Sequence, residues 1–317
     1  MQFIYPPTFT PSATKITFAQ PDFGPSGIPH SEVFGDVYFS DTGGASEKEQ
    51  VFVKGNGLPK RLMESPLPEF AVGETGFGSG LSLLMLIKNL KEAGFWEPPA
   101  PENISSSPKA TAPISVHPKE LIYLSTELYP MTCADMRKAH QVFPEITTES
   151  QELLNAYDET KLHLGLNILT PWPHTKIYLL VGDVLETLPQ LEIRNGGIDA
   201  WFLDGFSPQK DLAMWSPECA QQLQRLSRRG ATIATYTVAG FVRRNLIAAG
   251  FAVQKVPGFG RKKEMLAGVL TELSKKSPTS IGGGGCHISF GFPSCQECHA
   301  ICFANFFGFL VIGYCGL

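Results

Sequence analysis

Four carboxylates stand at the ends of separate apolar runs in this chain of 317 residues: Glu74, Glu127, Asp183 and Asp204. A single acid in such a position usually caps a helix or fixes a turn. Four in succession can line one crevice, because the carboxyl ends of parallel strands meet at the same edge of a sheet. Gathered there, they would accept hydrogen bonds from a polar ligand, and one of them could accept a proton.

A glycine-rich turn directly follows the first of these acids. Residues 76–80 read Gly-Phe-Gly-Ser-Gly and lead into Leu81–Ile87, whose apolar spacing predicts a helix. The glycines let backbone approach a ligand where a Cβ atom would collide, and the helix offers its N-terminal N–H groups. The pattern Glu-x-Gly-x-Gly-x-Gly resembles the first motif of methyltransferases that use S-adenosylmethionine (SAM). A dinucleotide fingerprint differs, since it has two residues between its second and third glycines.

This resemblance gives the acids separate roles. Glu127 is placed to accept hydrogen bonds from ribose hydroxyls, and Asp183 to lie near an adenine amino group. Asp204 is predicted beside the reacting group and is the candidate catalytic residue. No metal ligands are predicted. Seven residues are predicted to bind the cofactor: Glu74, Gly76, Phe77, Gly78, Gly80, Glu127 and Asp183.

The elements that would position these residues alternate between strands and helices. Strands are predicted near 70–72, 121–124, 177–181, 198–203, 231–236, 251–256 and 265–270. Helices are predicted at 131–141, 151–162 and 241–249. This alternation indicates an α/β fold with a mostly parallel, seven-stranded sheet and helices on both faces. A further short strand is predicted at 49–53, followed by a turn at 54–57.

Composition narrows the class of protein. A net charge of −4, 43% hydrophobic residues and 18% charged residues are ordinary for a globular protein and give no global sign of nucleic-acid binding. The first 20 residues lack a basic start followed by an apolar core, so no signal peptide is predicted. Only Cys133 and Cys219 precede residue 280, which indicates a reducing, cytoplasmic compartment.

Changes in composition also suggest the domain boundaries. Residues 1–30 are rich in Pro, Thr and Gly and are predicted to be an irregular lead-in. The main domain is predicted at 31–272 and contains a surface insertion at about 96–118, where six prolines and three consecutive serines exclude regular structure. Residues 273–317 differ from the rest and form an aberrant tail.

The segment 199–215 has a distinctive sequence that resembles that of a known protein family. Its sequence, Asp-Ala-Trp-Phe-Leu-Asp-Gly-Phe-Ser-Pro-Gln-Lys-Asp-Leu-Ala-Met-Trp, closely resembles the methyltransferase domain of the MnmC family. These bifunctional enzymes complete the side chain on the wobble uridine of certain tRNAs. The likeness runs from about residue 30 to 272 and includes the segments 36–40, 74–81, 239–244 and 258–266.

The resemblance implies a Rossmann-like, class I SAM-dependent methyltransferase. Its reaction would move a methyl group from SAM to the aminomethyl nitrogen of 5-aminomethyl-2-thiouridine, giving 5-methylaminomethyl-2-thiouridine. In full-length relatives a second, FAD-dependent oxidase domain follows and supplies the amine by removing a carboxymethyl group. FAD is therefore expected only in full-length relatives, and the oxidase activity is expected to be absent from this chain.

Aromatic and basic residues of the second half are predicted to hold the tRNA anticodon arm. Between Arg225 and Lys263 there are nine Lys or Arg residues and no acid, which predicts a basic surface for phosphates. The aromatic side chains could stack a flipped-out base, although each alone is more often part of a core. The predicted substrate-binding residues are Phe206, Pro208, Tyr236, Phe241, Arg243, Arg244, Phe259, Arg261, Lys262 and Lys263.

The tail admits several interpretations. Cys295-Gln296-Glu297-Cys298-His299 matches a haem-attachment pattern, and the tail cysteines with His287 and His299 could bind zinc. The uncharged run 300–317 is near the minimum length of a membrane span. We favour a fourth interpretation, in which the chain leaves its reading frame near Gly285. The tail would then be the truncated or frameshifted start of the FAD-dependent domain, and no membrane association is expected.

Three other functions stay open at this point. The first is a SAM-dependent N-methyltransferase that acts on another substrate, and the second is a non-catalytic SAM-binding module. The third is an NAD(P)- or FAD-dependent oxidoreductase, which the glycine spacing disfavours. The sequence leaves the oligomeric state and the identity of the tRNAs open.

Overall fold

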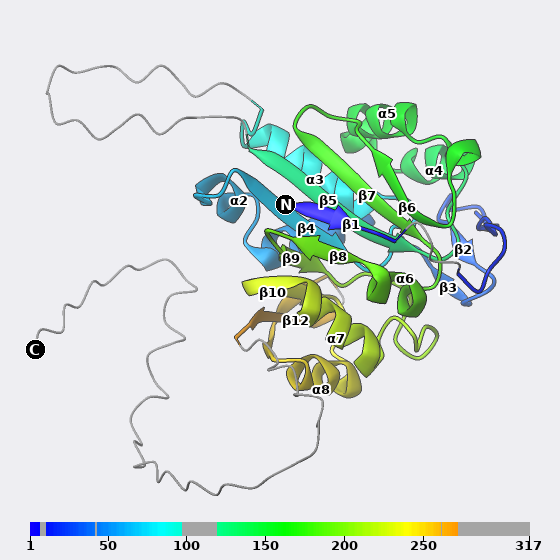
Figure 1. Cartoon of the computed structure of the whole chain (residues 1–317). Coiled ribbons are helices and arrows are strands. Elements are labelled where there is room, and N and C mark those ends of the chain that lie inside the picture. The colour runs from blue at the N-terminus through cyan, green and yellow to red at the C-terminus, as the bar shows by residue number, and fades with distance from the viewer. Residues whose placement is uncertain (7–10, 42, 97–118, 261, 272–317) are drawn as a thin grey trace, which may run out of the picture. The chain divides into compact units, whose positions relative to one another are not determined.

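The computed structural model describes residues 1–6, 11–41, 43–96, 119–260 and 262–271 (Figure 1). Arg261, nearly all of the predicted insertion and the whole predicted tail lie outside the described residues. The interpretations of the tail therefore stay predictions.

The central sheet has eight strands in the order β11-β12-β10-β9-β4-β5-β7-β6. Its five inner strands, from β10 to β7 in this order, are parallel to one another. They are β4 (Glu69–Glu74), β5 (Glu120–Glu127), β7 (Thr175–Val181), β9 (Ile198–Phe202) and β10 (Ser227–Thr235). The antiparallel strands are β6 (Gly165–Leu169), β11 (Phe251–Phe259) and β12 (Lys262–Leu270).

The seven predicted strands are confirmed, and β6 is the eighth. It is a short edge strand whose residues alternate between buried and exposed positions, and Ile168 within it is 58% exposed. An edge strand of this kind lacks the continuous apolar run by which the inner strands can be predicted.

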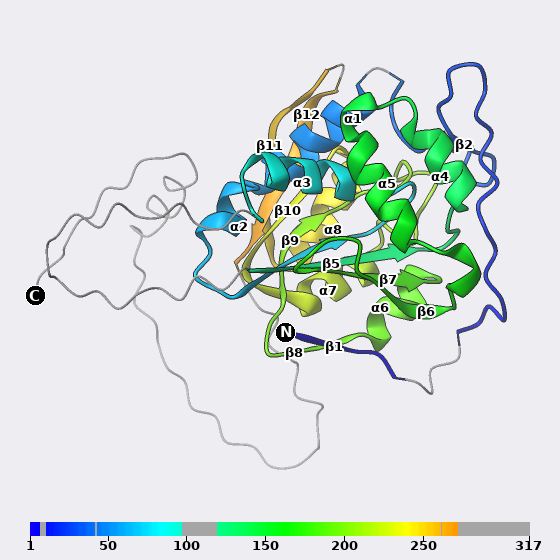
Figure 2. The ribbon, with the colours of Figure 1, turned by 90° about the horizontal axis from the view of Figure 1, so that it is seen from above.

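Helices cover both faces of the sheet (Figures 1 and 2). One face carries α3 (Leu81–Glu92), α4 (Cys133–His140) and α5 (Thr147–Ala156), which pack into one buried cluster. The other face carries α6 (Val184–Gln190), α7 (Pro217–Leu226) and α8 (Gly240–Ala248), which pack into another. A fully buried sheet explains why the inner strands read as continuous apolar runs.

The central strand β4 passes very close to its neighbour β9. A Cβ atom at Gly73 would lie 2.3 Å from the Trp201 ring, which is itself fully buried. Gly73 is thus required by packing, while the glycines that follow β4 form the turn into α3. The glycine turn follows β4, and Asp204 follows β9. This close approach therefore holds together the two strands that lead into the site.

The predicted strand at 49–53 is wrong. The chain is helical there, with α1 (Gly44–Lys48) running into a π-helical turn at Glu49–Val53 and a 3₁₀ turn at Lys54–Asn56. Val51, Phe52 and Val53 are all buried, and such a short apolar run cannot separate a buried strand from a buried helix. Helix α2 (Lys60–Glu64) follows.

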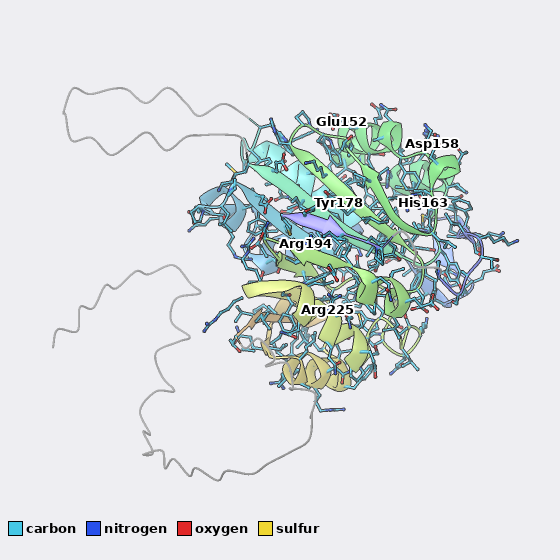
Figure 3. All side chains as sticks on the ribbon, viewed as in Figure 1. Glu152, Asp158, His163, Tyr178, Arg194 and Arg225 are labelled. Atoms are coloured by element: carbon cyan, nitrogen blue, oxygen red, sulfur yellow. The ribbon has the colours of Figure 1, made fainter. Side chains whose placement is uncertain are left out.

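The lead-in is more ordered than predicted. Strand β1 (Gln2–Ile4) pairs with β8 (Glu192–Arg194), whose Arg194 is labelled in Figure 3 together with Tyr178. Phe3 packs on Tyr178 with ring centroids 4.6 Å apart. A small hairpin joins β2 (His30–Ser31) and β3 (Asp36–Val37). The predicted helix at 151–162 begins earlier and ends at Ala156, and short 3₁₀ turns occupy Pro144–Ile146 and Glu159–Lys161.

Within the described residues, no helix combines the length and the apolar character needed to cross a bilayer.

Candidate active site

A cavity opens where the inner parallel strands end, at the edge at which three of the four predicted acids meet. This first cavity encloses about 820 Å³ of space, part of it open to solvent. Among its lining residues are Gly76, Phe77, Gly78, Glu127, Asp183, Asp204 and Phe206. Seven predicted site residues thus lie around one space.

The glycine turn forms one wall of the first cavity. Gly78 has a φ of +52°, a conformation that residues with a Cβ atom rarely adopt, and its N–H donates to Glu127 Oε2 at 2.7 Å. A Cβ atom at Gly76 would lie 3.4 Å from the backbone of Asp204 and Gly205. The turn is therefore held between the acid that ends β5 and the acid that follows β9.

A buried histidine also holds the glycine turn through a hydrogen bond to its backbone. His140 Nε2 lies 2.7 Å from the carbonyl oxygen of Ser79, and Nδ1 lies 2.7 Å from Ser150 Oγ. Because a carbonyl only accepts, Nε2 carries the proton and Nδ1 accepts from the serine. Burial lowers the pKa of His140, which favours this neutral form.

Glu127 lines the first cavity and is held by two backbone N–H groups. Its Oε1 accepts from the N–H of Tyr129 at 2.9 Å, in addition to the bond from Gly78. Burial raises the pKa of Glu127 to about 7, and these two N–H groups oppose the shift. The carboxyl group is therefore poised between its neutral and ionised forms near neutral pH.

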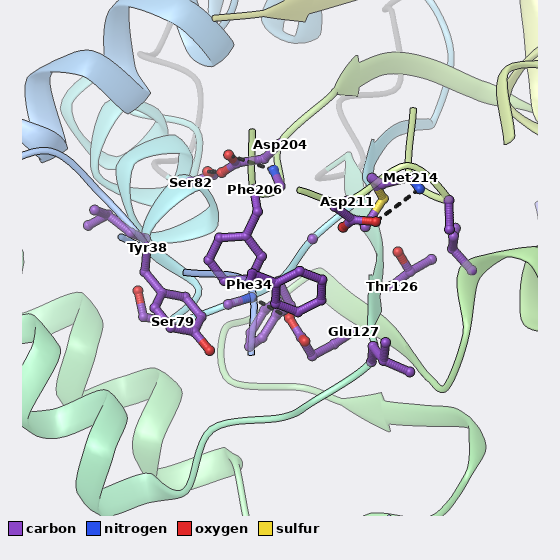
Figure 4. Close-up of a pocket in the computed structure, with 18 of the residues that line it drawn as sticks. Phe34, Tyr38, Ser79, Ser82, Thr126, Glu127, Asp204, Phe206, Asp211 and Met214 are labelled. Atoms are coloured by element: carbon purple, nitrogen blue, oxygen red, sulfur yellow. Dashed lines mark hydrogen bonds between the residues drawn. The ribbon is translucent and has the colours of Figure 1, made fainter. Parts of the chain in front are cut away.

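Aromatic rings and a helix cap complete the first cavity. Phe34 stacks on Phe206 with centroids 4.4 Å apart, and Tyr38 meets Phe206 edge-on at 5.0 Å (Figure 4). Asp183 caps α6 by accepting a hydrogen bond from the N–H of Leu185 at 2.8 Å, and Asp183 also lines the cavity. Asp183 therefore caps a helix and, at the same time, lies where a ligand-binding residue would lie.

Asp204 is buried and almost fully paired. Its Oδ2 accepts from the ammonium of Lys48 and from Ser82 Oγ at 2.9 Å, and its Oδ1 accepts from the N–H of Gly205 at 2.9 Å. A carboxylate offers about four acceptor positions. One position, on Oδ1, is left for a further donor.

Glu74 lies behind this arrangement and does not line the cavity. It is fully buried in β4, its Oε2 accepts from Ser125 Oγ at 2.7 Å, and its Oε1 has no partner among the described residues. Burial, followed by the negative charge of Asp204, raises the pKa of Glu74 to about 8. Strand alternation turns this side chain into the core, so Glu74 does not line the cavity that Glu127, Asp183 and Asp204 share.

A second cavity adjoins the first and is larger. It encloses about 1,520 Å³ open to solvent and is lined by the lead-in, the β2–β3 hairpin, α1, Tyr236 and Lys262. The two cavities have five lining residues in common, which form a shared wall: Val37, Tyr38, Lys48, Asp204 and Gly205. Two ligands seated in the two cavities would therefore meet at Asp204.

The sequence of this chain is similar to those of known methyltransferases. Residues 144–271 match a protein family described as S-adenosyl-L-methionine-dependent methyltransferase. The tRNA 5-methylaminomethyl-2-thiouridine biosynthesis bifunctional protein MnmC of Aeromonas hydrophila is 42% identical over 268 residues, which are 84% of this chain and 37% of that protein. The MnmC protein of Aliivibrio fischeri is 40% identical over 83% of this chain and 36% of its own length.

This chain carries the methyltransferase domain of the MnmC family. It spans little more than a third of the length of these curated relatives. The crystal structure of MnmC2 from Aquifex aeolicus superposes with a TM-score of 0.51 at 19% identity, covering 77% of this chain and 66% of that one. The fold is the expected class I SAM-dependent methyltransferase fold.

The structure brings only part of the predicted substrate site of this MnmC domain together. Tyr236 and Lys262 line the second cavity, and Phe206 lines the first. Phe241 packs on the core beneath α8, and Phe259 lies beside Gly43. The predicted residues that line neither cavity are Glu74, Gly80, Pro208, Phe241, Arg243, Arg244, Phe259 and Lys263.

The basic surface of the MnmC domain is smaller than predicted, because acids from elsewhere in the fold reach it. Arg228 pairs with Asp199 at 2.8 Å, and Lys262 pairs with Glu47 at 2.6 Å. Lys255 likewise pairs with Glu264, which lies one residue beyond the acid-free segment. A segment that contains no acids can therefore still lie beside acids that other segments of the folded chain supply.

Residues that the sequence did not single out complete the site of the MnmC domain. Lys48 lies just before the wrongly predicted strand at 49–53. Tyr38 lies in the segment 36–40 that resembles the MnmC family, and Phe34 precedes that segment. Their functional signal is spatial, since Lys48 reaches the cavities from α1, and Phe34 and Tyr38 reach them from the β2–β3 hairpin and the residue after it. Within the described residues, no group of three or more His, Cys, Asp or Glu side chains is arranged to hold a metal ion.

Proposed function

We propose that this MnmC methyltransferase domain transfers a methyl group from SAM to the aminomethyl nitrogen of 5-aminomethyl-2-thiouridine at the tRNA wobble position. The observation that carries the proposal is the shared wall, where a cofactor in the first cavity and an acceptor in the second would meet at Asp204. Methyl transfer requires its two reactants in line and in contact, so adjoining cavities with a common wall suit it.

The first cavity fits the chemistry of SAM. Gly78 leaves room for a ligand beside the turn, and Glu127 offers acceptor oxygens for ribose hydroxyls. Val184, Leu128 and Met214 add apolar surface of the kind that holds a nucleobase. SAM supplies an electrophilic methyl group on a sulfonium centre.

The chain's own residues must then position a neutral amine. A primary alkylamine has an ordinary pKa of about 10, and its protonated form has no lone pair with which to attack. Asp204 Oδ1 has one acceptor position left, so it can hold one N–H of the amine and direct the lone pair toward the first cavity. Lys48 and Ser82 fix the carboxylate for this task. As the N–C bond forms, the S–CH₃ bond would break with its electron pair staying on the sulfur, and the nitrogen would release its extra proton to the solvent of the open second cavity.

Exposed arginines outside the cavities support tRNA as the acceptor. Arg243 and Arg244 lie near the N-terminus of α8, where the helix dipole disfavours cations, and no acid occupies the first turn. Within the described part of the chain, neither arginine has a carboxylate at ion-pairing distance, and the same holds for Lys263. A phosphate backbone would satisfy all three, which favours the anticodon arm as the partner.

The wider setting follows from the same proposal. The carboxymethyl-removing FAD chemistry of full-length relatives would lie in sequence that this chain does not share with them. Since its substrate is tRNA, we place the protein in the cytoplasm.

The proposal is tested by mass spectrometry of wobble nucleosides after the purified protein is incubated with SAM and tRNA that bears the aminomethyl group. A mass gain of one methyl group on the wobble nucleoside is expected. SAM binding without any methylated nucleoside would favour a non-catalytic SAM-binding module. Methylation of another acceptor only would favour a different N-methyltransferase.

A further inference from the structure

We infer that Lys210 is a positioning residue that holds the β2–β3 hairpin across the first cavity, so that SAM enters and the demethylated cofactor leaves only when this hairpin opens. The inference rests on the proposed function for one point, that SAM occupies the first cavity. It does not depend on the identity of the acceptor.

The β2–β3 hairpin lies at the mouth of the first cavity. Val37 of the hairpin and Leu128, which follows β5, both line this cavity, yet their side chains are 45% and 38% exposed. Side chains that are both lining and exposed mark the place where the cavity opens to solvent. The position of the hairpin therefore sets how wide this opening is.

An aromatic contact carries the tip of the hairpin across the cavity. Phe34 stacks on Phe206 with ring centroids 4.4 Å apart, and it also meets Tyr129 at 6.1 Å (Figure 4). Phe206 follows β9, and Tyr129 follows β5, so Phe34 bridges the ends of two strands whose acids, Glu127 and Asp204, line the cavity.

Polar contacts join the same tip to the loop after β9. The ammonium of Lys210 donates to the carbonyl oxygen of Gly35 and lies 3.7 Å from Asp36 Oδ1, while the N–H of Ser207 donates to Asp36 Oδ2 at 2.9 Å. These partners are 171 to 175 residues apart in the sequence. A single side chain, that of Lys210, thus makes two of the contacts that hold the hairpin closed.

Little within the hairpin itself holds the tip in place. Its ladder consists of two residue pairs, His30 with Val37 and Ser31 with Asp36, and none of residues 32–37 is buried. Segments with so few buried contacts open locally at a low cost in free energy, and loops of this kind gate many enzyme sites. The contacts of Lys210 should therefore control how often the hairpin opens.

Exchange rates distinguish this role from simple support of the site. A contact that keeps the hairpin closed both with and without SAM slows binding and release by the same factor, so its removal speeds both and leaves the dissociation constant nearly unchanged. A side chain that only supports the bound cofactor acts differently, because its removal raises the release rate and the dissociation constant in proportion.

The experiment measures SAM exchange on the full chain, without an acceptor, for the wild type, Lys210→Met and Lys176→Met. Release is followed by chasing bound radiolabelled SAM with unlabelled SAM, calorimetry gives the dissociation constant, and the binding rate follows from the two. Lys176→Met is the matched control, since Lys176 is similarly exposed and pairs with Glu120. Both residues of that control pair stand at the N-terminal ends of their strands and line neither cavity.

Lys210→Met should release and bind SAM about two- to tenfold faster than the wild type, the range for the loss of an exposed ion pair together with a charged hydrogen bond. The control should exchange SAM like the wild type. Asp36→Asn keeps an acceptor for the N–H of Ser207 but removes the charge that Lys210 faces, so its rates should lie between. Added salt should speed release from the wild type more than from Lys210→Met, because salt screens the exposed pair.

An unchanged release rate in Lys210→Met would overturn the inference. A release rate and a dissociation constant that rise by the same factor would also overturn it. A wild type that binds no SAM would overturn the inference together with the cofactor assignment. The expected exchange rates, in a protein that methylates no tRNA, would support the inference and contradict the proposed function alone.

Discussion

Lys48, the last residue of α1, forms a buried ion pair with Asp204, which lies 156 residues further along the chain. Their side chains are only 11% and 10% exposed, and both residues belong to the shared wall of the two cavities. The pair joins α1 to the loop after β9. It also turns Asp204 from a free base into a fixed carboxylate with one open acceptor position.

Asp204→Asn should slow methyl transfer about 10²-fold or more, because a reacting nitrogen that is no longer oriented loses the benefit of precise positioning. The residual rate should recover as the pH rises, because more of the acceptor amine is then neutral. Single-turnover rates measured between pH 7 and 10 would check this. A normal rate per folded molecule, combined with a lower melting temperature, would remove Asp204 from the catalytic role and leave it as a turn residue.

A double-mutant cycle separates the pair from the chemistry. Lys48→Met leaves Asp204 buried without its cation, and Asp204→Asn does the same to Lys48, so each should destabilise the fold by about 3–5 kcal/mol. The double variant should regain part of this stability, since neither charge is left unpaired, yet it should stay slow. Urea unfolding and single-turnover rates on all four proteins complete the cycle, and additive losses of stability would show that the two residues do not interact.

Gly78→Val should abolish measurable SAM binding, because valine at a φ of +52° is strained and its side chain would project toward Tyr38, 3.3 Å from the Cβ position. Gly230→Val is the matched control, with a φ of +82° and no atom within 4 Å of its Cβ position. Calorimetry with SAM should show wild-type affinity for the control. Wild-type affinity in a folded Gly78→Val protein would contradict the assignment of the turn.

SAM binding should strengthen as the pH rises from 6 to 8. The pKa of Glu127 is raised to about 7, so the free protein holds a proton there at low pH, and ribose hydroxyls favour the ionised acceptor. Below pH 7 the dissociation constant should rise by up to about tenfold per pH unit, the limit for the uptake of one proton. Glu127→Gln, which cannot ionise, should bind more weakly at pH 8 and show a flat profile in calorimetry. A profile as steep as that of the wild type would assign the proton to another group.

Arg243→Glu/Arg244→Glu should raise the KM for tRNA and reduce the slope of affinity against salt concentration, because fewer counterions are released on binding. The SAM dissociation constant should not change, since neither arginine lines the first cavity. Arg229→Glu is the control, an exposed arginine in the N-terminal half of β10, whereas the cavities lie beyond the C-terminal ends of the inner strands. Equal salt slopes in filter binding for all three proteins would leave this surface as an ordinary solvated face.

Several features of the protein follow from local sequence alone. The apolar runs near β4, β5, β7, β9 and β10 predicted the parallel sheet, because strands buried on both faces need continuous apolar residues. The glycine turn and the acids at the strand ends predicted the first cavity, because parallel strands bring their carboxyl ends to one edge. Gly78, Glu127 and Asp183 therefore lie where their spacing placed them.

Tertiary structure decided what depends on contacts between distant segments. The lead-in, which has no periodic pattern, supplies Asp22 to the second cavity, and the β2–β3 hairpin supplies Asp36. The positive charge of Lys262 is compensated by Glu47, 215 residues earlier in the chain. Lys48 finds Asp204 because the π-helical turn that follows α1 packs on β9, where Phe52 stacks on Phe202. Spacing along a chain fixes periodic elements, but a side chain's electrostatic partner is set by which segments the packed fold brings within a few ångströms of each other.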